Sequence, residues 1–91
     1  MTSTTFIPCE HVVFTDFEGG EGILVDLNTK RYYRLNETAA LIWRSLEQRK
    51  SAAEIAAEFE ATYEVTQEHA RQSIGKLLER LETSKLVRTK T

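Results

Sequence analysis

The chain has 91 residues and a formal net charge of −2, with 41% hydrophobic and 29% charged residues. That length suits one compact domain, and the composition is typical of an ordered globular protein rather than a disordered one. The slightly acidic balance is unfavourable for a general nucleic-acid-binding protein, which needs cations to neutralise phosphates.

The N-terminus and the cysteine content indicate a cytoplasmic protein. Residues 1–8 have neither the basic region nor the apolar region of a secretory signal, and no apolar run approaches the ~20 residues that cross a bilayer. Cys9 is the only cysteine, so the chain has no intramolecular disulfide. We expect a single domain over residues 1–91, with about the first eight residues flexible, and no membrane partner.

Three short segments in the first part of the chain have the composition of β-strands. Residues 11–15 and 23–27 are rich in β-branched and aromatic side chains. Residues 17–22 between them contain three glycines and predict a turn. Residues 28–30 suit a hairpin connection to a third strand at residues 31–35, which is then antiparallel to the second strand.

Three helices are expected after the strands. Asn36 is a favourable N-cap for a first helix of about three turns, and Ser51 with Glu54 fits the capping box of a second. Thr66 is expected to cap the third and longest helix. Its apolar stripe comprises Ala70, Ile74, Leu77, Leu78 and Leu81. Residues 86–87 are expected to pack back onto the core.

Strands followed by helices predict an α+β domain. The expected architecture is a three-stranded antiparallel sheet followed by three helices, an arrangement like a winged helix-turn-helix. Trp43 falls on the apolar stripe of the first helix and is expected in the core. Tyr32 and Tyr33 are adjacent on one strand, so one should face the core and the other should face outward.

Residues that carry catalysis or bind metals are scarce. His11 and His69 are the only imidazoles, and no ligand spacing of a zinc site is present. We interpret His69 as a solvated histidine and Cys9 as an incidental thiol. The glycines of residues 19–22 form no phosphate loop, because a strand rather than a helix follows them. We therefore expect a protein that is not an enzyme, with no catalytic residue, no metal and no cofactor.

Four segments, taken in order, resemble PQQ biosynthesis protein D over about residues 12–88. They are Tyr33-Arg-Leu-Asn36-Glu-Thr-Ala-Ala40, Ala53-Glu-Ile-Ala-Ala-Glu-Phe59, Tyr63-Glu-Val65, and Leu77-Leu78-x-x-Leu81 with Leu86-Val87. The wider group contains the recognition elements for ribosomally synthesised, post-translationally modified peptides. The order and spacing of the segments carry the resemblance, more than any one of them.

The chain departs from that family at four places. Lys30 stands where the family often has Gly in the second hairpin, and residues 48–50 (Gln-Arg-Lys) stand where it often has Gly after the first helix. A frequent acidic residue of the third helix aligns with Ser73, and a Gly near the end aligns with Lys85. These departures bear on the pathway more than on the fold.

The resemblance implies that the chain binds the leader segment of a precursor peptide and delivers it to a modifying enzyme. The leader resembles an added strand, antiparallel to the third strand and packed against the third helix. Unpaired backbone groups at a strand edge supply affinity, and pockets for alternate side chains supply specificity. The implied peptide-binding residues are Lys30, Arg31, Tyr32, Tyr33, Arg34, Leu35, Ala70, Arg71, Ser73, Ile74, Gly75, Leu77 and Leu78.

The partner enzyme that the resemblance implies is a leader-cleaving protease, as in lasso-peptide pathways, or a radical-SAM enzyme, as in the PQQ pathway. The length of the chain favours the lasso-peptide type. An exposed sheet edge also leaves a homodimer open.

Charge is distributed in blocks. Residues 30–50 and 70–91 each contain six basic and two acidic side chains, whereas residues 1–29 and 51–69 each contain five acidic and no basic ones. We hypothesise that a positive rim meets acidic leader residues, the alternative being solvated surface charges. The residues of this rim are Lys30, Arg31, Arg34, Arg71 and Lys76. Gly75 costs up to ~1 kcal/mol in a helix relative to Ala, and either lets the peptide approach closely or is simply tolerated.

Two other functions stay open. A winged-helix DNA-binding regulator would use the third helix for recognition, but that helix carries Glu68, Glu79 and Glu82, which oppose phosphate binding. A structural subunit or inhibitor of another protein is the second alternative.

Overall fold

The computed structural model describes residues 5–90 of the chain. The strands are β1 (Thr5–Pro8), β2 (Val12–Asp16), β3 (Gly22–Asp26), β4 (Arg31–Leu35) and β5 (Val87–Lys90), and a short 3-10 turn, η1, spans Glu18–Gly20. The helices are α1 (Glu37–Glu47), α2 (Ala52–Tyr63) and α3 (Gln67–Thr83). The expected three-stranded sheet followed by three helices is present, so the α+β prediction is confirmed. Strands β1 and β5 come in addition.

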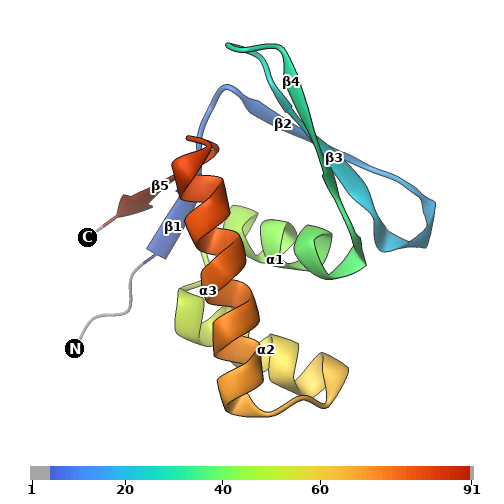
Figure 1. Ribbon diagram of the computed structural model, residues 1–91, viewed down its shortest axis with the longest axis vertical. Coiled ribbons are helices and arrows are strands. Elements are labelled where there is room, and N and C mark those ends of the chain that lie inside the picture. The colour runs from blue at the N-terminus through green and yellow to red at the C-terminus, as the bar shows by residue number, and fades with distance from the viewer. Residues whose placement is uncertain (1–4, 91) are drawn as a thin grey trace.

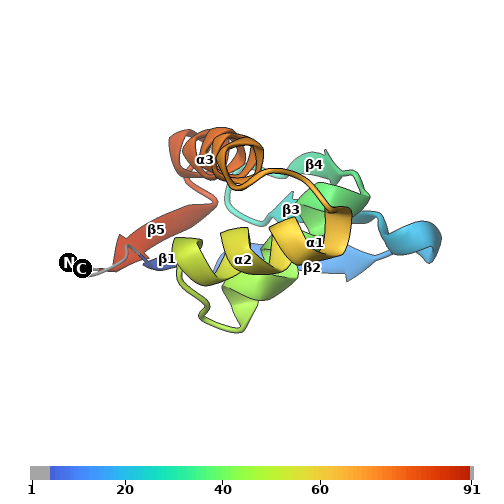
Figure 2. The same ribbon diagram turned by 90° about the horizontal axis from the view of Figure 1, so that it is seen from below.

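The main sheet has the order β2-β3-β4, with both pairs antiparallel. Leu24 in the middle strand lies opposite Phe14 on one side and Tyr33 on the other, and it is completely buried. Tyr32, the next residue along β4, is 75% exposed, while Tyr33 is half-buried. The prediction that the two tyrosines face opposite sides is therefore confirmed. The main sheet extends away from the helices at its far end, and of its three strands β4 is the one on the side of α3 (Figures 1 and 2).

The hairpin between β3 and β4 is closed by the carboxylate of Asp26. Its Oδ1 accepts the backbone N–H groups of Asn28 at 2.9 Å and Thr29 at 3.2 Å, while the N–H of Lys30 donates to the Asp26 carbonyl at 2.8 Å. Lys30 has φ 64°, a left-handed conformation that favours glycine. The aspartate thus organises a turn in which the chain carries lysine at the position where the family often has glycine.

The two ends of the described chain pair with each other. β1 and β5 form a separate antiparallel two-stranded sheet in which Ile7 lies opposite Arg88, and the two strands lie side by side in both ribbon views (Figures 1 and 2). Ile7 is buried. We expected residues 1–8 to be flexible; residues 5–8 are instead a strand, because a partner from the other end of the chain satisfies their backbone groups. Residues 1–4 lie outside the described residues.

All three predicted helix caps are confirmed. The side chain of Asn36 accepts the N–H of Ala39 at 2.8 Å at the start of α1. Ser51 and Glu54 form the reciprocal capping box of α2. Thr66 accepts the N–H of His69 at 3.1 Å at the start of α3. These bonds satisfy backbone donors that the first turn of a helix leaves free.

The core lies where the inner face of the main sheet meets the three helices. Figure 2 shows α3 as a layer above α1 and α2. Trp43, expected in the core, is 1% exposed, and Leu86, just before β5, is equally buried. The largest fully buried side chains are Trp43, Leu24, Ile42, Leu46, Ile55 and Leu86. These residues come from the main sheet, α1, α2 and the segment before β5, and Ile74, Leu78 and Leu81 of α3 belong to the same cluster. The main sheet and all three helices therefore contribute to one core.

Candidate functional site

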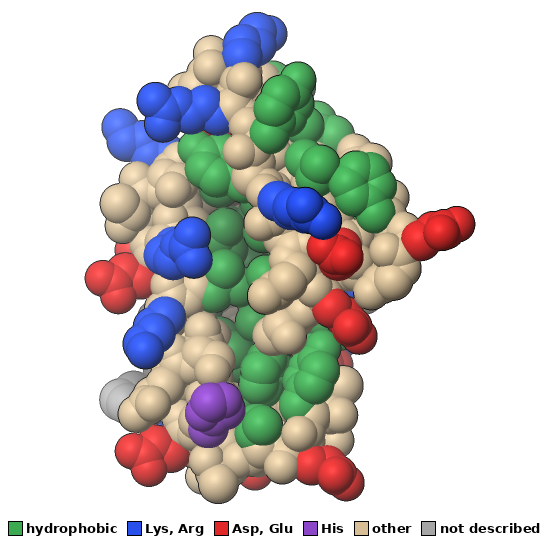
Figure 3. Space-filling view, turned by 45° about the vertical axis from the view of Figure 1, so that its right-hand side comes forward, with side chains coloured by type: hydrophobic (Ala, Val, Ile, Leu, Met, Phe, Trp, Pro, Cys, Tyr) green, Lys and Arg blue, Asp and Glu red, His purple; other side chains and the backbone are tan. Residues whose placement is uncertain are grey.

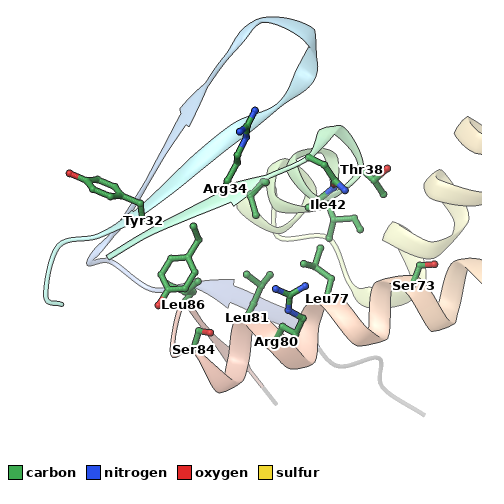
Figure 4. Close-up of a pocket in the computed structure, with 14 residues that line it drawn as sticks. Tyr32, Arg34, Thr38, Ile42, Ser73, Leu77, Arg80, Leu81, Ser84 and Leu86 are labelled. Atoms are coloured by element: carbon green, nitrogen blue, oxygen red, sulfur yellow. The ribbon is translucent and has the colours of Figure 1, made fainter. Parts of the chain in front are cut away.

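A groove of about 500 Å³ runs between the edge strand β4 and helix α3. It is lined by Tyr32, Tyr33, Arg34, Leu35, Asn36, Thr38, Ala39, Ile42, Ser73, Leu77, Arg80, Leu81, Ser84 and Leu86. Figure 4 shows that β4 and α3 form its two sides, with Ile42 of α1 between them. A groove bounded by an edge strand on one side and a helix on the other suits an extended chain better than a compact small molecule.

The β4 side of the groove offers backbone hydrogen-bonding groups. β4 pairs with β3 on one side and, in residues 5–90, with no strand on the other. In an antiparallel pair alternate residues direct both backbone groups away from the partner strand. An extended segment placed in the groove can therefore hydrogen-bond to β4 while its alternate side chains point toward the helices.

The α3 side is a stripe at helical spacing. Ser73, Leu77, Leu81 and Ser84 follow one another at steps of four, four and three residues, and Arg80 lies three residues after Leu77, which places all five on one face of the helix. Leu77 is only half-buried although it is apolar, so it stands partly open to the groove. The floor is thus apolar, with serine hydroxyls toward both of its ends (Figure 4).

The charged side chains lining the groove are both arginines. Arg34 of β4 points its guanidinium to Glu21, 3.3 Å away, and its side chain is 79% exposed. Arg80 of α3 has no carboxylate within 4.0 Å among the described residues, and Figure 4 shows its guanidinium directed from the helix toward β4. Figure 3 shows an apolar strip down this face, with lysine and arginine side chains along its left side and a mixture of basic and acidic side chains on its right. The groove therefore has an apolar floor and one arginine from each of its two sides.

The structure brings together six of the thirteen residues that the resemblance implied. Tyr32, Tyr33, Arg34, Leu35, Ser73 and Leu77 line the groove. Lys30 lies in the hairpin before β4, and Arg31 is its exposed first residue. Ala70 is completely buried within the core.

The other four implied residues lie on a different face of α3. Arg71, Ile74, Gly75 and Leu78 line a second hollow of about 340 Å³, whose opposite wall is formed by Ala52, Ala53 and Ala56 of α2. A Cβ added to Gly75 would meet nothing within 4 Å. The structure therefore gives Gly75 no close approach to β4 or to the groove beside it.

Sequence reasoning missed eight lining residues. They are Asn36, Thr38, Ala39, Ile42, Arg80, Leu81, Ser84 and Leu86. For α3 a signal existed, because steps of three or four residues from Ser73 reach Leu77, Arg80, Leu81 and Ser84. For Ile42 and Leu86 no local signal existed, since both look like ordinary core residues and are 1% exposed.

The described residues hold little that could perform catalysis. No group of three or more His, Cys, Asp or Glu side chains that could hold a metal is found in residues 5–90. His11 Nε2 lies 3.8 Å from Asp26 Oδ1, and neither residue lines the groove. Burial raises the pKa of Asp26, but the hydrogen bonds from Thr29 and Asn28 and the neighbouring His11 outweigh burial and hold this pKa below its usual value. These contacts stabilise the hairpin.

Comparison with known proteins bears directly on this fold. The family model for coenzyme PQQ synthesis protein D (PqqD) matches residues 21–87. No match is found among the curated proteins. Among the described residues, no helix is long and apolar enough to cross a membrane.

Two solved structures are closely similar. One, described as TbiB1 in complex with the TbiA(beta) leader peptide, has a TM-score of 0.86 and 26% sequence identity, and the match covers 90% of this chain and 94% of that chain. The other, described as lasso peptide synthetase B1 complexed with the leader peptide, has a TM-score of 0.83 and 26% identity, covering 91% and 96%. The resemblance inferred from the sequence is confirmed. The chain belongs to the family of coenzyme PQQ synthesis protein D.

Proposed function

We propose that this chain binds the leader segment of a ribosomally synthesised precursor peptide and presents it to a processing enzyme. The observation that carries the proposal is the free edge of β4 beside a groove with an apolar floor. Two similar structures are described as complexes with leader peptides, and one of these proteins is described as lasso peptide synthetase B1, which favours the lasso-peptide type of pathway.

The binding mode is strand addition. The leader pairs with β4 through its backbone, and its alternate side chains pack on Leu77, Leu81 and Ile42. Five residues of β4 span about 16 Å at the usual rise of a strand, so the paired part of the leader is about five residues long. Affinity then depends on the backbone and on apolar contact, and each contributes only if the leader can extend along the groove.

The role of the chain is that of a carrier and not of a catalyst. Holding the leader raises the local concentration of the attached core peptide at a bound partner enzyme, which requires no bond-making here. The partner that fits this role is a leader-cleaving protease, and the site of action is the cytoplasm, where ribosomal precursors are made.

The test is a calorimetric titration with the synthetic leader of a precursor encoded beside this chain. We expect saturable one-to-one binding, lost when a proline replaces a paired leader residue, because proline lacks the N–H that β4 must receive. Ser73→Trp should fill the groove and abolish binding, whereas Gln72→Trp, exposed on the same helix, should bind as the unmodified chain does. Equal binding by both variants, or tight binding to duplex DNA in place of the leader, would contradict the proposal.

A further inference from the structure

Arg80 occupies a special position in the groove. It is the cation of α3 that lines the groove, one helical turn after Leu77 and next to Leu81. Its guanidinium is directed toward the space beside β4, where an added strand would lie (Figure 4). Sequence reasoning assigned the positive rim to other residues, none of which is Arg80.

The charge of Arg80 is not balanced within the described chain. The ion pairs of residues 5–90 join Arg34 to Glu21, Arg44 to Asp16, Lys50 to Glu58 and His11 to Asp26. The fourteen groove residues include no aspartate or glutamate. On the outer side of α3, Arg80 is flanked by Lys76 and Glu79, and Glu79 makes no ion pair with it. A peptide in the groove would thus cover a guanidinium that has no carboxylate of its own.

We infer that Arg80 sets the specificity of the groove by binding the side-chain carboxylate of an aspartate or glutamate in the occupying peptide. This inference rests on the proposed function and names the class of peptide that the groove accepts. Burying an unpaired guanidinium under a peptide removes water from the charge and costs free energy. A carboxylate that accepts two hydrogen bonds from the guanidinium offsets this cost. A peptide with an acidic residue at that place therefore binds more tightly than the same peptide with a neutral one.

Strand and helix spacings place the acidic residue relative to an apolar one. Side chains on the same face of an extended peptide are about 6.6 Å apart, whereas Arg80 and Leu81 lie about 4.5 and 6.0 Å beyond Leu77 along the axis of α3. A peptide side chain that packs on Leu77 therefore has its second neighbour close to Arg80. The motif accepted by the groove is an apolar residue and an acidic residue separated by one position.

The first experiment is selection from a phage-displayed library of random ten-residue peptides. The baits are the unmodified full chain, Arg80→Glu and the groove-filled Ser73→Trp. We expect the unmodified chain to enrich peptides with an acidic residue two positions from an apolar one, and Arg80→Glu to enrich lysine or arginine there instead. Enriched peptides without an acidic preference would overturn the role of Arg80 while the proposed function stands. Enrichment no greater than that of Ser73→Trp would overturn both.

The second experiment measures coupling in solution with one enriched peptide. Changing its acidic residue to the amide should weaken binding to the unmodified chain about tenfold, the size expected for a charge-assisted hydrogen bond. The same change should leave binding to Arg80→Gln unaltered, while Arg88→Gln, an exposed arginine of β5 outside the groove, should retain the tenfold loss. Equal losses of affinity with Arg80→Gln and Arg88→Gln would show a general attraction of the acidic peptide to positive charge. That result would contradict the assignment of Arg80 as the residue that binds the carboxylate.

Discussion

The backbone N–H of Leu86 donates to the carbonyl of Leu81 at 2.9 Å, and this bond ends helix α3. The N–H of Lys85 donates to the carbonyl of Glu82 at 3.0 Å, and Lys85 has φ 60°. The two bonds form a Schellman motif, in which the residue after the cap is left-handed and the next residue packs back on the helix. Because Leu81 and Leu86 both line the groove, this helix terminus also shapes one end of it (Figure 4).

Replacing Lys85 by glycine should stabilise the protein by about 1 kcal/mol, because a left-handed conformation costs a side chain roughly that much and costs glycine nothing. Arg49, with φ 64° at the same kind of helix end after α1, should respond in the same way. Urea denaturation measures both changes. Lys76→Gly, in the interior of α3, is the control and should lose about 1 kcal/mol. If Lys85→Gly, Arg49→Gly and Lys76→Gly were all stabilised, or if none were, the left-handed conformation of Lys85 and Arg49 would not be a source of strain.

Ile7→Ala should destabilise the protein by about 2 kcal/mol or more, because Ile7 is buried where β1 packs beside α1. Val13→Ala, on an edge strand and 44% exposed, should cost less than about 0.5 kcal/mol. Thermal unfolding of the two variants makes the comparison. Equal effects would mean that β1 is not part of the cooperative unit, and residues 5–8 would then behave as the sequence alone predicted.

Stability should depend on pH through the capping box of α2. Hydrogen bonds from Ser51 hold the pKa of Glu54 below its usual value, with a smaller contribution from Lys50. A lowered pKa in the folded state adds stability above the unfolded value of about 4.3, and that stability is lost as the pH falls through the folded pKa. We expect the urea midpoint of Glu54→Gln to fall below that of the unmodified chain at pH 7 and to approach it near pH 3.

A matched variant separates the charge of Glu54 from the cap itself. Ser51→Ala removes the hydroxyl that accepts the Glu54 N–H and should cost about 1 kcal/mol at neutral pH, while the backbone N–H of residue 51 still donates to the Glu54 carboxylate. In the Ser51→Ala background, Glu54→Gln should therefore still produce a pH-dependent difference, but a smaller one, because the side chain of Ser51 no longer lowers the pKa of Glu54. No pH-dependent difference in either background would assign the acid sensitivity to another carboxylate.

Two glycines should respond in opposite ways to alanine. Gly75→Ala should stabilise α3 by about 0.5–1 kcal/mol, because it lies in a helix and an added Cβ meets nothing within 4 Å. Gly22→Ala should destabilise the fold, because its Cβ would collide with the ring of Phe14 on the neighbouring strand. Peptide binding by Gly75→Ala should equal that of the unmodified chain. Weaker binding would show that the hollow between α2 and α3 takes part in recognition.

The sequence by itself determined the local structure. The helix caps and the hairpin between β3 and β4 depend on contacts between residues two to four apart, so the residue types alone predict them. These residues are Asn36, Ser51 and Thr66 for the caps and Asp26 for the hairpin. The order of three strands and three helices follows from periodicities of two and of about 3.6 residues. Trp43 could be assigned to the core because it lies on an apolar stripe.

Only the tertiary structure decided which faces meet. The composition of β1 does not predict a strand, because the segment is too short. It forms a strand because β5, some eighty residues away in the sequence, pairs with it. Helix α3 is apolar toward two neighbours, so its pattern alone could not tell that Leu77 and Arg80 face β4 while Ile74 and Leu78 face α2. Periodicity fixes which residues share a face of a helix, but the neighbour of that face depends on how the whole chain packs.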